Sequence, residues 1–170
     1  MEMTPAQLAT LKAYILADPV LSTKISGPGT DFTFVANALN GNASPDFWVL
    51  RSTLSRHEIL TGTSADGTTF AWAAGAYITR SQGERDAFRE MFNSTGSVDP
   101  SLPSIMAAFA DIFSGTGGAG NRTHITAMSR RKATVAEKVL ATGAGTTVAP
   151  AKANFEGMID VSPTLTTMFG

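Results

Sequence analysis

Apolar residues recur every three or four positions through much of this chain, the spacing that places them on one face of a helix. The first such segment follows Thr4 and Pro5, a helix cap and a proline suited to the first helical position, and Gln7 completes a capping box. Similar signals precede apolar stripes at Thr30 or Asp31, Ser44, Ser81 and Ser101, and a long helix is expected from about Thr123 to Ala141. The pattern therefore predicts a mainly α fold, a helical bundle.

The pattern changes between residues 61 and 72. The turn dipeptide Asp66-Gly67 is flanked there by Thr, Ser, Phe and Trp residues, which favour extended backbone. We expect one small, protruding β-hairpin at about residues 61–72.

Residues 142–170 combine helix-breaking residues with many apolar side chains. Glycine and proline recur there, at Gly143, Gly145, Pro150, Gly157 and Pro163. A solvated linker would contain fewer apolar side chains and more charge. We therefore expect an extended C-terminal arm, residues 142–170, beside a helical body of residues 1–141. Another molecule is expected to cover the apolar side chains of this arm, which include Phe155, Met158, Ile159, Leu165, Met168 and Phe169.

Charge is distributed unevenly along the chain. The sequence has 13 basic and 14 acidic residues, a formal net charge of −1, yet residues 122–138 hold five basic residues against Glu137 alone. Arg130, Arg131 and Lys132 are consecutive, and on a helix they would point about 100° apart. They could contact the phosphates of DNA or pair with an acidic neighbour. We favour the acidic neighbour because the chain as a whole is not basic.

Few residues offer catalytic or metal-binding chemistry. Cysteine is absent, and His57 and His124 have no convergent partners in the sequence. The run 115–120 fits a dinucleotide-binding glycine spacing, but the segment before it reads as a helix where that fingerprint needs a strand. We expect no catalytic, cofactor or metal site, both histidines at surface or boundary positions, and the glycine run as a flexible joint. An enzyme that uses the glycine run and His124 is the least favoured hypothesis.

The amino terminus has no basic region followed by an apolar run, and no stretch approaches the roughly 20 apolar residues of a membrane span. We therefore expect a soluble protein that is not exported and has no membrane partner.

Four strings in the chain resemble a family of small structural proteins of tailed bacteriophages, the head-to-tail adaptor (connector) proteins. The strings are residues 44–49 (SPDFWV), 64–70 (SADGTTF), 78–85 (ITRSQGER) and 130–134 (RRKAT). The similarity runs from Thr4 to about Gly157. The resemblance implies a homo-oligomeric ring, commonly of twelve copies, built on a helical bundle whose C-terminal arm binds the portal protein. It supplies no catalytic or cofactor residue.

The expected function is thus a non-enzymatic adaptor in the virion neck, made in the host cytoplasm, that joins the head to the tail. The arm would bind the portal protein, and Asp66 and Gly67 would contact the neighbouring subunit or the next tail or nozzle protein. Arg130, Arg131 and Lys132 would face an acidic portal surface or DNA passing through the channel. The alternative is a small nucleic-acid-binding protein that uses the basic helix 122–138.

Overall fold

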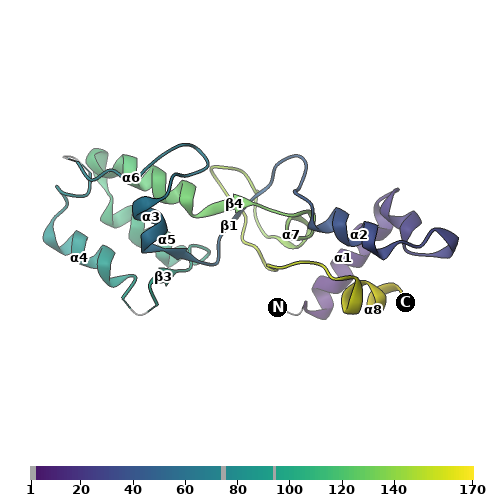
Figure 1. The fold of residues 1–170 in the computed structure, drawn as a ribbon. Helices are drawn as coiled ribbons and strands as arrows, with labels where there is room; N and C mark the ends of the chain where they lie inside the picture. The colour runs from purple at the N-terminus through teal and green to yellow at the C-terminus, as the bar shows by residue number, and fades with distance from the viewer. Residues whose placement is uncertain (1–2, 74–75, 94) are drawn as a thin grey trace. The chain divides into compact units, whose positions relative to one another are not determined.

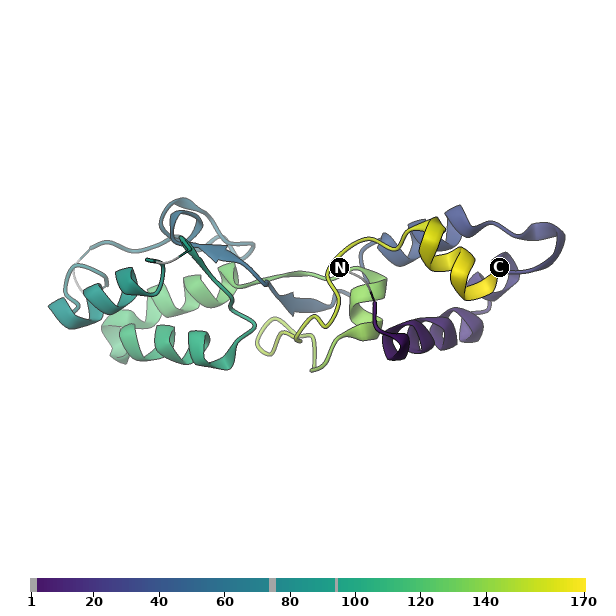
Figure 2. The same cartoon turned by 90° about the horizontal axis from the view of Figure 1, so that it is seen from below.

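The computed structural model describes residues 3–73, 76–93 and 95–170, and it has the mainly α fold that the sequence predicts, with a small antiparallel two-stranded sheet. The chain forms two compact units (Figures 1 and 2). The terminal unit contains Met1–Val49 and Lys132–Gly170, and the central unit contains Leu50–Arg131. This division differs from the expected body and arm, because residues 142–170 share one unit with the N-terminal helices.

The terminal unit is built from short helices. They are α1 (Pro5–Ala17), η1 (Leu21–Lys24), η2 (Gly27–Gly29), α2 (Phe32–Asn40), α7 (Val135–Leu140), η3 (Val161–Leu165) and α8 (Thr166–Phe169). The predicted capping box at α1 is confirmed, since Thr4 N donates to Gln7 Oε1 at 2.8 Å and Gln7 N donates to Thr4 Oγ1 at 3.3 Å. Asp31 likewise caps α2. The core of this unit joins both ends of the chain: Leu11, Ile15, Val35, Leu39, Leu140, Phe155, Ile159 and Leu165.

The central unit packs helices around aromatic side chains. Its elements are β2 (Leu54–Ser55), α3 (Arg56–Thr61), α4 (Gln82–Glu90), β3 (Ser97–Val98), α5 (Pro103–Ile112) and α6 (Gly115–Met128). The fully buried Phe88 ring lies 5.4 Å from the Phe92 ring and 5.5 Å from the Phe113 ring, both edge-on. Edge-on packing matches the positive rim of one ring to the negative face of the next, so these contacts add to the hydrophobic burial.

The strands are short and pair segments that are distant in the sequence. β1 (Trp48–Leu50) pairs with β4 (Arg130–Lys132), and β2 pairs with β3 so that Leu54 lies opposite Val98. The expected hairpin is a tight turn closed by a single bridge, Thr63 to Thr69, and Ser64 N donates to Thr68 O at 2.9 Å. Gly67 has a φ of 76°, a left-handed conformation that favours glycine.

Two helix predictions are wrong because tertiary pairing overrides local preference. The stripe after Ser44 is extended, since Trp48 N donates to Gly145 O at 2.8 Å and Trp48 O accepts from Ala151 N at 2.9 Å. The long helix from Thr123 to Ala141 is interrupted: α6 ends at Met128, β4 follows, and α7 begins at Val135. A strand pair satisfies the same backbone groups that a helix would, so packing decides between them.

The glycine run is also different from the expectation. Residues 115–120 form the first turns of α6 and are not a flexible joint. Gly115 takes a φ of 71° at the corner after α5, and a side chain at Gly118 would overlap the backbone of Phe113. The glycines therefore allow α6 to pack closely against the end of α5.

Candidate partner-binding surface

The C-terminal segment folds onto its own unit. Of the six side chains expected to bind a partner, Phe155, Ile159 and Leu165 are buried in the terminal core. Met168 and Phe169 are partly buried against the same core. The prediction that another molecule, and not the chain's own core, covers these five side chains is therefore wrong. The glycines and prolines that break the helix in this segment also let it turn back along α1, α2 and α7.

Polar contacts fix this segment along its length. The amide of Asn40 binds the backbone of Ile159 twice, donating to its carbonyl at 2.9 Å and accepting from its N–H at 2.7 Å. Gln7 donates to Asn154 O at 2.7 Å, and Lys12 donates to Met168 O at 2.7 Å. These bonds satisfy backbone groups that have no helix or sheet partner, so they hold the irregular backbone of the segment in place.

Two large apolar side chains of the segment are exposed to solvent. Val148 is 89% exposed and Met158 is 72% exposed. Val148 lies at the tip of a turn in which Thr146 N donates to Ala149 O at 3.1 Å and Ala149 N donates to Thr146 Oγ1 at 3.0 Å. Of the six arm residues, only Met158 is thus exposed, and the predicted set did not include Val148, whose exposure depends on this turn.

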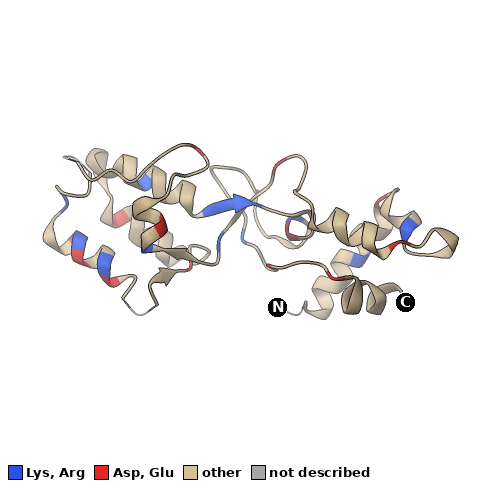
Figure 3. Ribbon diagram, viewed as in Figure 1, with Lys and Arg blue, Asp and Glu red and all other residues tan. Residues whose placement is uncertain are grey.

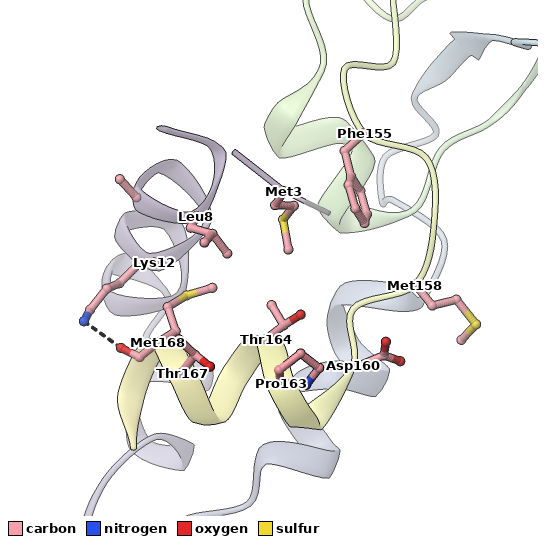
Figure 4. Close-up of a pocket in the computed structure, with 11 residues that line it drawn as sticks. Met3, Leu8, Lys12, Phe155, Met158, Asp160, Pro163, Thr164, Thr167 and Met168 are labelled. Atoms are coloured by element: carbon pink, nitrogen blue, oxygen red, sulfur yellow. Dashed lines mark hydrogen bonds between the residues drawn. The ribbon is translucent and has the colours of Figure 1, made fainter. Parts of the chain in front are cut away.

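Met158 lies at the rim of a groove of about 620 Å³ between α1 and the C-terminal helices. Figure 4 shows Leu8, Phe155 and Met168 around this groove, with Met158 directed outward. Its lining residues are Met3, Leu8, Ala9, Lys12, Phe155, Met158, Asp160, Pro163, Thr164, Thr167 and Met168. The groove is thus mainly apolar, with one basic and one acidic residue.

The basic residues 130–132 form strand β4 and not part of a helix (Figure 3). The Arg130 side chain is 7% exposed and forms an ion pair with Asp66. Lys132 Nζ lies 2.7 Å from Asp46 Oδ2. Arg131 is half-buried. The expected acidic neighbours of Arg130 and Lys132 therefore belong to the same chain, and the prediction of a basic helix over residues 122–138 is wrong.

The hairpin residues have a structural role that the sequence did not predict. The Asp66 carboxylate is held by Arg130, which fixes the turn on the central unit. Gly67 is exposed beside it and supplies the left-handed turn conformation. The turn remains accessible for the contact expected of it.

His124 is fully buried, which contradicts its expected surface or boundary position. Its Nε2 lies 2.8 Å from Ile59 O, and its Nδ1 lies 3.1 Å from Thr68 O and 3.2 Å from Thr68 Oγ1. One turn earlier on α6, Asn121 accepts from Ala71 N at 2.7 Å and donates to Ala71 O at 2.9 Å. Both side chains therefore fasten the hairpin region to α6, and neither is available for catalysis. His57 is exposed, as expected.

One carboxyl group has a strongly shifted pKa. Hydrogen bonding from Arg51 lowers the pKa of Glu58 from 4.5 to about 2, and the backbone N–H of Ser55 contributes in the same direction. The Arg51 backbone N–H also donates to Ser129 O at 2.9 Å. The Arg51–Glu58 ion pair therefore joins the start of α3 to the end of α6, and this structural role accounts for the shifted pKa of Glu58.

Within residues 3–73, 76–93 and 95–170 we find no cluster of three or more potential metal ligands and no helix long and apolar enough to span a membrane. Comparison of the chain with known protein families, curated proteins and solved structures gives no match. The candidate functional site is therefore the surface of the C-terminal segment, defined by the Val148 turn, Met158 and the adjacent groove.

Proposed function

We propose that this chain is a structural, non-catalytic subunit of a tailed-phage virion, a head-to-tail adaptor that docks on the portal protein. The observation that carries the proposal is the exposure of Val148 and Met158 on a segment whose other large apolar side chains are buried or partly buried in the terminal core. Exposed large apolar side chains on an ordered scaffold favour a protein partner. The resemblance of the four strings to adaptor proteins supplies the identity of that partner.

The mechanism differs from that of a flexible arm. Because Asn40 and Lys12 already fix the segment, docking would order little additional chain, and the conformational entropy lost on binding would be small. The docking surface is thus preorganised before the portal arrives. Val148 at its turn would enter a pocket of the partner, and Met158 would adapt its flexible side chain to the surface around it.

The remaining parts of the proposal follow from the resemblance. Copies of the chain would form a ring in the virion neck, commonly of twelve subunits, with the tail or nozzle protein on its far side. In this arrangement the turn at Asp66 and Gly67 would contact the neighbouring subunit or the next tail component.

The test replaces both exposed side chains in the full-length chain, Val148→Lys with Met158→Lys, during phage assembly. We expect a folded protein with an unchanged unfolding midpoint, and electron micrographs of heads without tails. Asn37→Lys, at an exposed polar position of α2, is the matched control and should give tailed particles. Normal tailed particles from the double variant would reject the docking surface, and tailed particles without any copy of this chain would reject the adaptor role.

A further inference from the structure

The groove between α1 and the C-terminal helices is unfilled although the residues around it are well fixed. Leu8 reaches it from α1, Phe155 from the segment before η3, and Met168 from α8 (Figure 4). Its volume of about 620 Å³ lies within the range of pockets that hold a ligand or several side chains. Three of its lining residues are methionines, Met3, Met158 and Met168, whose flexible side chains suit a surface that adapts to a partner.

The walls of the groove restrict the form of the occupant. One wall is α1, and the other combines η3 and α8 with the irregular segment that carries Phe155 and Met158, so no lining residue belongs to a strand. An extended peptide binds best along an exposed strand edge, which this groove lacks, and its own N–H and C=O groups would be left without partners. A helix satisfies its backbone internally and needs only an apolar face. The walls therefore favour a helix.

The charges restrict the occupant further. Lys12 is engaged: its Nζ donates to Met168 O at 2.7 Å and lies 5.0 Å from the centre of the Phe169 ring. The exposed carboxylate of Asp160 has no hydrogen bond or ion pair with any side chain in the described part of the chain. The terminal unit also contains five lysines and no arginine against seven acidic residues. A basic side chain on the occupant would complement this surface.

We propose that the groove binds a short amphipathic helix of a partner protein, with apolar side chains against Leu8, Phe155 and Met168 and a lysine or arginine opposite Asp160. Such a helix would present apolar anchors at i, i+3 or i+4, and i+7. This inference rests on the proposed function, because it takes the assembly partner to be the protein that carries this amphipathic, basic helix. The experiment uses the isolated full-length chain, so its result is separate from that of the phage assembly test.

The probe is a library of short helical peptides with apolar residues at those positions and randomised flanking residues. It is panned against the chain, with Ala9→Trp as the counter-target, because Ala9 is exposed and lines the groove. Ala17→Trp is the matched control, since Ala17 is exposed on the same helix and does not line the groove. We expect enriched peptides with a basic residue that bind wild type and Ala17→Trp equally, and Ala9→Trp about tenfold or more weakly.

A charge reversal tests the position of the basic residue. Asp160→Lys should weaken the enriched peptides about tenfold and should favour versions in which their basic residue is replaced by glutamate. Asp46→Lys, outside the groove, should leave both affinities unchanged. Failure to enrich peptides over the counter-target, or enrichment of peptides without a basic residue, would overturn the proposal. Sedimentation of the free chain supplies one more outcome: self-association that Ala9→Trp abolishes would assign the groove to a second copy and would also overturn it.

Discussion

The side chain of Asn40 and the backbone of Ile159 form two hydrogen bonds, of 2.9 and 2.7 Å, between positions 119 residues apart. An asparagine amide offers a donor and an acceptor side by side, so it can pair with one residue of an extended chain as a neighbouring strand would. Asn121 binds Ala71 in the same way in the central unit. In each compact unit, an asparagine on a helix thus holds an irregular segment in place.

Replacing Asn40 by alanine should release the C-terminal segment. Both bonds to Ile159 are lost, and leaving partly buried backbone groups unpaired costs about 1–3 kcal/mol. Urea denaturation should show that loss, and protease should cleave residues 142–170 faster. Asn37→Ala, at an exposed position on the same helix, should change neither measurement. Equal stability of the two variants would show that the pairing is not needed.

Shortening the side chain to alanine should destabilise the chain strongly at Leu165 and hardly at all at Met158. Leu165 is fully buried in the terminal core, so Leu165→Ala should cost about 2–5 kcal/mol in the free energy of unfolding. Met158 is mostly exposed, and Met158→Ala should change stability by about 0.5 kcal/mol or less. Chemical denaturation of both variants checks this. A small effect at Leu165 would restore the hypothesis of an arm that is covered only by a partner.

Replacing His124 by phenylalanine should destabilise the central unit without creating a large cavity. The ring nitrogens lose their bonds to Ile59 and Thr68 in a fully buried site, at a cost of about 1–3 kcal/mol. The exposed His57 provides the control, since His57→Phe removes no buried bond. The free energies of unfolding should differ clearly between the two variants. If they agree, His124 contributes only its volume.

Two glycines of α6 should show opposite effects of the same change. A Cβ at Gly118 would overlap the carbonyl oxygen of Phe113, so Gly118→Ala should disturb the corner between α5 and α6 and lower the melting temperature. Gly120 has open space at the same atom, and Gly120→Ala should stabilise the helix by about 0.4–1 kcal/mol. Calorimetry of the two variants compares them directly. A stable Gly118→Ala variant would contradict the close packing.

The acid response should depend on Glu58. Its pKa lies near 2 in the folded chain and at 4.5 in its ordinary state, so the stabilisation by its charged form is complete above pH 4.5 and disappears as the pH falls toward 2. Glu58→Gln should therefore be less stable than wild type at neutral pH, by an amount that shrinks below pH 4.5. Arg51→Met should also weaken this pH dependence, because it removes the largest cause of the shift. A pH-independent difference between wild type and Glu58→Gln would be inconsistent with this origin.

The amino-acid sequence by itself determined the features that depend on neighbours within about four residues. The capping box of Thr4 with Gln7, the start of a helix at Thr30 or Asp31 and the turn at Asp66-Gly67 all belong to this group. Their partners are close along the chain, so their geometry is nearly independent of the rest of the fold. The mainly α class follows from the same local signals.

Tertiary structure alone decided the features whose partners lie far away in the sequence. Arg130 to Lys132 are extended because β1 pairs with them, and the apolar C-terminal segment is covered because α1 and α2 supply both a core and the amide of Asn40. The composition of a segment shows that it is apolar, but it does not show which surface buries it. Hydrophobic attraction is non-directional, so the choice between a partner and the chain's own helices is made only when the whole molecule packs.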